Sequence, residues 1–181
     1  MAENIERKPI QLAEAISVLE VTPALLQVLF AKLPTAWLDF REDAEARSPR
    51  TVLVHFIQNE RTNWIPRAKV ILSPSAVRQF APFQQLPPPG EIDDTNVAAM
   101  LSEFARLRQE NLAILRGFNL TPGDYQRTAE HPALGTVTLA QLLATWVVHD
   151  LNHTHQLLKS LAKLQVTAVG PWRQYLAILD L

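Results

Sequence analysis

The sequence predicts an all-α protein, a four-helix bundle with a long proline-rich crossover between its second and third helices. Three observations predict this fold. Apolar residues recur at three- and four-residue spacing in four long stretches, no run alternates at period two for long enough to indicate a sheet, and prolines cluster between two of the stretches. A bundle requires this spacing, because each of its helices buries one apolar stripe.

The first helix is expected within residues 10–33. Thr22-Pro23 fits a helix N-cap followed by the first helical residue, so this region forms either two helices or one kinked helix. Ser48-Pro49 is a signal of the same kind and opens the second helix.

The second helix is expected to run on toward Leu72, with a kink at Pro66. Residues 73–94 are rich in proline and predict an irregular crossover with at most a short helical turn at residues 76–80. Crossovers of this length are either functional covers or stiff connectors, and both interpretations stay open.

Glycine and proline mark the ends of the remaining helices. The third helix is expected from about residue 95 to 116, with Gly117 as its C-terminal signal. The fourth, residues 131–164, is entered through a turn containing proline and glycine. It is followed by a break at Gly170 and a short amphipathic segment.

The composition is that of a globular protein with one core. The chain has 181 residues, of which 48% are apolar and 19% charged, and this length suits a single domain spanning residues 1–181. The net charge of −1, with acids and bases interspersed, predicts no nucleic-acid partner.

The absence of cysteine excludes disulfides, thiolate ligands and a cysteine nucleophile, and fits a cytoplasmic location. No secretory signal or membrane span is expected from the uncharged stretches. We therefore expect a cytoplasmic protein with no membrane partner.

Two histidines one helical turn apart mark the last helix. His149 and His153 lie on the same face, and Asp150 is the only formally charged residue between Glu130 and Lys159. A helix this apolar is usually interior, where two imidazoles need partners. A bound metal ion is one such partner.

A second polar, uncharged stripe runs through His55 and Asn59 of the second helix. If the two stripes face each other, His55 converges with His149 and His153. Three neutral imidazoles suit Zn²⁺, Ni²⁺ or Fe²⁺ and leave open positions for water or substrate. The alternative is a purely structural bundle whose histidines satisfy one another.

The other histidines and two tryptophans fit a site less well. His155 points roughly 240° around the helix from His149, so a surface or packing role is expected. A structural role is favoured for His131, beside a turn, over a place at a pocket mouth. Trp64 and Trp146 either line an apolar pocket or, more commonly for such residues, fill the core.

Two carboxylates accompany the histidines. Asp150 directly follows His149 and cannot easily share its metal, so we expect it to support a ligand or to contact another helix. Glu60 is a proton carrier only if its helix turns it toward the site. A surface ion pair with Arg61 or Arg67 is the favoured interpretation.

The segment LVHFIQNERTNWIPRAKVIL, which contains His55, and the segment HPALGTVTLAQLLATWVVHDLNHTHQLL resemble the DinB-like superfamily of four-helix bundles. Residues 101–108 and 131–138 match further spacings of that family, and the resemblance covers nearly the whole chain. It implies a divalent metal held by one residue of the second helix and two of the last. Position by position, these residues are His55, His149 and His153.

Relatives in this superfamily are similar to metal-dependent hydrolases and thiol-dependent transferases. The resemblance therefore implies a small-molecule substrate and a divalent transition metal, zinc first, with nickel and iron as alternatives. It also implies a low-molecular-weight thiol as a further cofactor for the transferase reaction. A non-catalytic metal- or small-ligand-binding protein of a stress response is the alternative to an enzyme.

The two reactions make different demands on the chain. Hydrolysis needs a proton acceptor near the metal, and Glu60 is the only candidate that the sequence offers. Thiol transfer needs an external thiol, since the chain has no cysteine. Arginines at the pocket mouth would favour an anionic thiol, and the candidates are Arg61, Arg67, Arg106 and Arg108.

Packing within the bundle is not the only explanation for the near absence of charge along the last helix. Burial against a second subunit would produce the same pattern. We therefore expect a homodimer.

Overall fold

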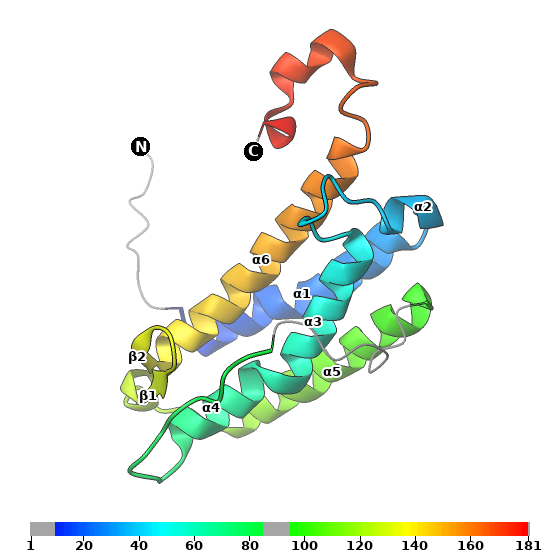
Figure 1. Ribbon diagram of the computed structural model, residues 1–181. Helices are drawn as coiled ribbons and strands as arrows, with labels where there is room; N and C mark the ends of the chain where they lie inside the picture. Colours follow the sequence, from blue (N-terminus) through cyan, green and yellow to red (C-terminus); the bar gives the residue numbers. More distant parts are fainter. Residues whose placement is uncertain (1–9, 85–94, 181) are drawn as a thin grey trace, which may run out of the picture.

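Four long helical segments lie side by side in the computed structural model, which describes residues 10–84 and 95–180 (Figure 1). These segments are α1 (Leu12–Phe30), α3 (Pro49–Thr62) continued by α4 (Trp64–Leu72), α5 (Val97–Gly117) and α6 (Leu139–Lys163). The mostly helical chain therefore has the predicted four-helix bundle. A short helix, α2 (Thr35–Leu38), lies between α1 and α3.

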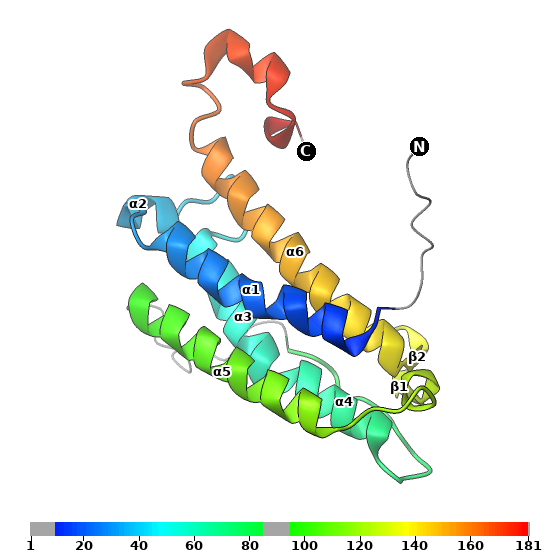
Figure 2. The ribbon, with the colours of Figure 1, turned by 180° about the vertical axis from the view of Figure 1, so that it is seen from behind.

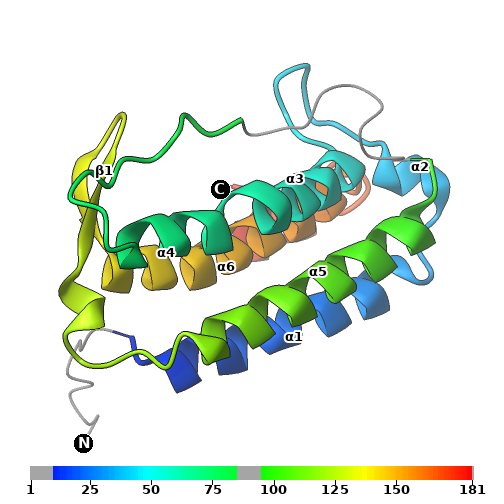
Figure 3. The same ribbon diagram turned by 90° about the horizontal axis from the view of Figure 1, so that it is seen from below.

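The bundle has two layers, with α1 and α5 in one and α3, α4 and α6 in the other (Figure 3). Both α1 and α3 contact α5 and α6, so α1 lies diagonally across from α3. Helix α6 therefore packs against both α1 and α3, and its face toward α3 lies inside the bundle. This arrangement positions the site described below.

The first helix is continuous. Pro23 lies inside α1, and Thr22 is buried in the bundle rather than placed at a helix start. Of the two predicted possibilities, the single helix is therefore the observed one.

The second helix begins where predicted and breaks before its proline. The hydroxyl of Ser48 accepts a hydrogen bond from the Thr51 backbone N–H at 3.2 Å. The break falls at Asn63, between α3 and α4. Pro66 has no N–H to offer the carbonyl of Thr62, one turn earlier, and its ring crowds that carbonyl.

The predicted all-α fold needs one correction, because α6 is entered through a β-hairpin. Strands β1 (Thr128–His131) and β2 (Gly135–Thr138) pair antiparallel, and α6 starts at Leu139 rather than at residue 131. Strands of four residues are too short for a period-two pattern to show. Gly135 has φ +72°, which suits the turn that closes the hairpin.

The described part of the crossover is extended. The helical turn predicted at residues 76–80 is absent. Instead the Phe80 N–H donates to the Glu130 carbonyl and the Glu130 N–H donates to the Arg78 carbonyl, at 2.9 and 2.8 Å. The crossover thereby adds to the hairpin and buries Phe80. Residues 85–94, on which the rest of the crossover prediction falls, lie outside the described residues.

The chain turns differently than predicted after α5. Gly117 is the last helical residue, and the left-handed conformation falls at Asn119, with φ 48°. A 3₁₀ turn, η1 (Asp124–Gln126), leads to the hairpin. Beyond α6 the predicted amphipathic segment forms two 3₁₀ turns, η2 (Gly170–Tyr175) and η3 (Ala177–Leu179), and η3 contacts α6.

Helix α1 is the one described helix that is long and apolar enough, by length and composition alone, to cross a membrane. No such segment was expected from the sequence. Core helices of soluble proteins meet the same criterion, and α1 buries Leu19, Leu26 and Phe30 within the bundle.

Candidate metal centre

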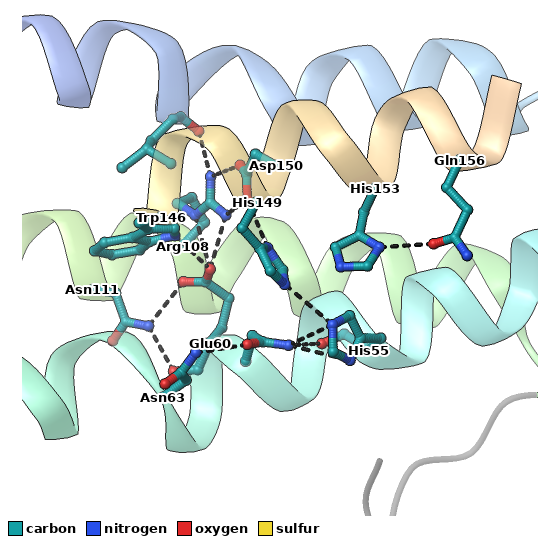
Figure 4. Close-up of polar contacts among 12 residues, drawn as sticks. His55, Glu60, Asn63, Arg108, Asn111, Trp146, His149, Asp150, His153 and Gln156 are labelled. Atoms are coloured by element: carbon teal, nitrogen blue, oxygen red, sulfur yellow. Dashed lines mark hydrogen bonds and ion pairs between the residues drawn. The ribbon is translucent and has the colours of Figure 1, made fainter. Parts of the chain in front are cut away.

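Three histidines from two helices meet at one point inside the bundle (Figure 4). His55 comes from α3, and His149 and His153 come from successive turns of α6. One ligand-capable nitrogen of each histidine lies within 4.8 Å of those of the other two. The structure thus brings together all three residues that the sequence singled out.

The rings are confined by aromatic neighbours. The Phe56 ring lies 5.8 Å from the His149 ring and 5.9 Å from the His153 ring, centroid to centroid. Trp64 approaches the His149 ring edge-on at 5.0 Å. His55 is buried, and its neighbour Asn59 donates its amide N–H to the His55 backbone carbonyl at 2.7 Å. These contacts limit the rotation of the imidazoles.

Gln156 orients His153. Its Oε1 lies 2.8 Å from Nδ1 of His153, so Nδ1 carries the proton and donates it. The lone pair of Nε2 is then free to bind a metal. Burial, followed by the neighbouring His149, lowers the pKa of His153 to about 4. His153 is therefore neutral at pH 7, as a metal ligand must be.

His149 has one nitrogen toward the cluster and one toward an acid. Its Nε2 lies 3.1 Å from Nε2 of His55. Its Nδ1 is buried without a hydrogen-bond partner among the described residues, and the nearest carboxylate oxygen, Oδ1 of Asp150, is 3.7 Å away. That distance is too long for a hydrogen bond of normal length, so Nδ1 faces the carboxylate without a close partner.

Asp150 belongs to a buried ionic network behind the histidines. The Arg108 guanidinium bonds Asp150 at 2.7 Å and Glu60 at 2.8 Å, and also donates to the Leu19 carbonyl at 2.7 Å. Burial opposes ionisation of Asp150, but His149 and Arg108 together hold its pKa below the usual range. The interhelix contact expected of Asp150 is therefore present.

The surface ion pair predicted for Glu60 is wrong, because Glu60 is fully buried. Its Oε1 accepts from Arg108 and from the Trp146 indole N–H, and its Oε2 accepts from Asn111 at 2.9 Å. Burial raises the pKa of Glu60, and Arg108 opposes that rise. With both oxygens engaged in the core, Glu60 has no role as a proton carrier at the histidines.

The three histidines fit a divalent metal. Nitrogen ligands around tetrahedral zinc, each about 2.0–2.1 Å from the ion, lie roughly 3.3 Å apart. The 3.1 Å between the Nε2 atoms of His55 and His149 is close to that value. One imidazole can donate its Nε2–H to the other at this distance, and a metal ion bound by both nitrogens would replace that hydrogen bond.

The histidines form one end of a cavity of about 370 Å³ between α3, α4, α6 and the hairpin. Trp64 lines it and stacks on the buried Trp146 at 5.5 Å, so one predicted pocket tryptophan faces the cavity and the other packs in the core. His131 both accepts from the Ala133 N–H in the hairpin turn and lines the cavity. His155 is exposed on α6, as expected.

The four arginines considered for the pocket mouth lie in different places, and one of them lines the cavity. Arg67 lines the cavity. Arg61 and Arg106 both bond Glu103 on the outer side of α5, and Arg108 is in the core. A further cavity residue, Arg47, was not singled out from the sequence, because it lies in the connector before α3 and outside any helical pattern.

Comparisons with known proteins agree with the fold. The model of the DinB superfamily matches residues 19–157. The chain is similar to YfiT from Bacillus subtilis, described as a probable metal-dependent hydrolase with an unusual four-helix bundle topology. The two share 21% identity and a TM-score of 0.70, over 91% of this chain and 92% of the other. No curated protein matches the chain. With most of its length matched by the family model, the chain belongs to the DinB superfamily.

Proposed function

We propose that this protein is a metal-dependent hydrolase of small molecules that holds a divalent transition metal through His55, His149 and His153. The observation that carries the proposal is the convergence of the three imidazoles at the inner end of a cavity large enough for a small ligand. Zinc suits three neutral nitrogen ligands best, with nickel and iron as the alternatives. The description of YfiT supports the same class.

A bound divalent metal lowers the pKa of a coordinated water or thiol and stabilises negative charge that develops on the substrate. The chain contributes the positioning. Gln156 fixes the ring of His153, and the Phe56 and Trp64 rings confine the imidazoles. Apolar residues of the wall, including Leu142 and Val137, reduce the contact of the site with water and so strengthen electrostatic interactions.

A thiol-dependent transferase is the second candidate, favoured by one specific observation. No aspartate or glutamate lines the cavity, so the described residues offer no carboxylate as a general base for hydrolysis. Thiol transfer needs none, because a metal favours the thiolate directly. The cofactor would be an external low-molecular-weight thiol.

Metal content is the first test. Untagged protein purified without chelator is analysed by elemental mass spectrometry beside His149→Ala. We expect one transition metal per chain in the wild type and its loss in the variant. A wild type that stays metal-free after reconstitution with zinc, nickel and iron contradicts the proposal.

Turnover then separates the reactions. The metal-loaded protein is assayed against esters and amides, and separately against a thiol with electrophiles. Hydrolysis supports the first candidate, and consumption of thiol supports the second. A loaded protein that turns over neither panel is a metal- or small-ligand-binding protein, such as one acting in a stress response.

We also propose that the protein is a cytoplasmic homodimer. Helices α1 and α6 lie side by side (Figure 2). Val21, Leu25 and Leu151 are exposed along an apolar groove between the two helices, and Val148 is exposed on α6. Contiguous exposed apolar side chains of this kind mark interaction surfaces. A second copy of the chain, packed through the same face, would cover them and explain the uncharged surface of α6.

A further inference from the structure

The cavity wall carries cations and no acid. Arg47 and Arg67 line it, and none of its lining residues is an aspartate or glutamate. Three neutral imidazoles also leave the charge of a divalent metal uncompensated by its ligands. A cavity with these groups and apolar walls favours an anionic ligand.

Arg67 is placed to bind that anion. Its Cζ lies 4.9 Å from the centre of the Phe80 ring and 5.5 Å from that of Phe83, distances typical of cation–π contacts. Among the described residues, no carboxylate forms an ion pair with Arg67. The half-buried guanidinium has lost part of its water, which lowers its pKa. Its hydrogen-bond donors are therefore available to a ligand.

The helical spacing gives the length of the ligand. His55, Asn59, Asn63 and Arg67 line one cavity at four-residue intervals along α3 and α4. Twelve residues at helical rise span at most roughly 18 Å between the first and last Cα atoms, and both the break at Asn63 and the side chains shorten this gap. The amides of Asn59 and Asn63 bond within this helical segment, Asn59 to the His55 carbonyl and Asn63 to the Asn59 side-chain oxygen. Apolar residues such as Trp64 line much of the rest. The cavity therefore suits an elongated molecule with a mostly apolar middle.

We propose that Arg67 is the anion-binding group of this cavity, and that the ligand is a small carboxylic acid with an apolar body. Its carboxylate lies on the guanidinium of Arg67, and its opposite end faces the three histidines. The planar guanidinium matches a carboxylate with two parallel hydrogen bonds. The apolar surroundings disfavour a doubly charged phosphate, which loses more hydration on burial. This assignment rests on the proposed function, because the histidine end needs its metal.

The probes are two series of linear hydroxamates, which chelate metal at one end and carry either a carboxylate or a carboxamide at the other. Chain lengths from four to ten methylenes are compared by calorimetry on the zinc-loaded protein. Wild type, Arg67→Gln, Arg67→Lys, Arg47→Gln and Arg61→Gln are compared. Arg61→Gln is the matched control, since Arg61 lies outside the cavity and bonds Glu103. Zinc content and circular dichroism check that each variant is folded and loaded.

We expect the carboxylate series to bind roughly tenfold to a hundredfold more tightly than the carboxamide series at one range of lengths. Arg67→Gln abolishes this preference without changing carboxamide binding. Arg67→Lys retains part of the preference, and Arg61→Gln retains all of it.

Other outcomes overturn the assignment in distinguishable ways. Equal binding of the two series at every length in the wild type refutes the anion site and leaves the metal site intact. Loss of the preference in Arg47→Gln but not in Arg67→Gln places the anion at Arg47 instead. Failure of zinc loading, or of both series to bind loaded protein, refutes the open metal site itself.

Discussion

Nη1 of Arg108 lies 2.7 Å from Oδ2 of Asp150, the residue that directly follows His149 in α6. Adjacent residues of a helix point about 100° apart, so one turn presents His149 to the cavity and Asp150 to the core. The buried ionic network and the candidate metal centre thus share one peptide unit. A substitution that shifts Asp150 is therefore expected to shift His149 as well, because the two residues are joined by one peptide bond.

Arg108→Leu should destabilise the fold strongly. It removes the one cation that pairs with both Glu60 and Asp150, and leaving buried carboxylates unpaired costs about 3–5 kcal/mol. Urea unfolding measures the loss. Arg106→Leu, which breaks ion pairs on the exposed side of α5, is the control and should change stability little. Equal losses in the two variants would show that the buried network is not a major stabilising feature.

The histidines should differ sharply in their effect on metal binding. His153→Ala removes a ring that faces the cluster, so bound zinc should be nearly lost. His155→Ala alters an exposed ring on the same helix and should leave zinc content unchanged. Elemental analysis of both variants tests the ligand set, and equal loss from both would mean that it is wrongly assigned.

Gln156→Leu should weaken zinc binding about tenfold to a hundredfold, because groups that orient a histidine ligand typically contribute that much affinity. The variant loses the acceptor that holds the Nδ1 proton of His153. Competition with a chromophoric chelator measures the change. Asn152→Leu, an exposed substitution on the same helix, is the control. An unchanged affinity in Gln156→Leu would show that His153 needs no such partner.

The stability of the metal-free protein should fall as the pH is lowered from about 6.5 toward 4. Burial and the neighbouring His149 lower the pKa of His153 to about 4, whereas an unfolded histidine titrates near 6.5. Between these values the unfolded chain binds the extra proton, so stability rises with pH. Above 6.5 the effect is complete.

His153→Asn should flatten this dependence. Urea unfolding at several pH values from 4 to 7 compares it with wild type and with His155→Asn, which alters an exposed ring. A slope that is the same in all three proteins would mean that His153 does not favour its neutral form in the folded state.

Leu151→Glu should convert the proposed dimer to a monomer, because it places a charge in the apolar groove between α1 and α6. Sedimentation velocity at micromolar concentration measures the change. Val77→Glu alters an even more exposed apolar side chain on the crossover and should leave the dimer intact. A wild type that sediments as a monomer at these concentrations refutes the dimer.

The long helices, and the start of α3, were predictable because their signals are local. The Ser48-Pro49 start of α3 depends on residues next to each other, and so does the apolar spacing along α6. The two strands of the hairpin escaped prediction, since each has four residues and is stabilised by its partner strand and by the crossover. The break of the second helix was placed at Pro66 rather than at Asn63, because proline disturbs the turn before it.

The site was predictable in part for the same reason. The spacing of His149 and His153 is a property of one helix and could be predicted from it. The prediction that His55 lies beside them held only if two helices faced each other, which the sequence does not show. Glu60 shows the limit most clearly. Its sequence neighbours Arg61 and Arg67 indicated a surface pair, but its partner is Arg108, 48 positions away on α5.

The sequence alone determined which helices form, which face of each is apolar, and that α6 carries two imidazoles one turn apart. These properties depend on backbone geometry over a few residues. The tertiary structure decided which polar side chains share a buried space. It paired Arg108 with both carboxylates and left Arg67 in the cavity, in contact with two phenylalanine rings. The cost of burying a charge depends on neighbours from distant parts of the chain, and only the folded arrangement supplies them.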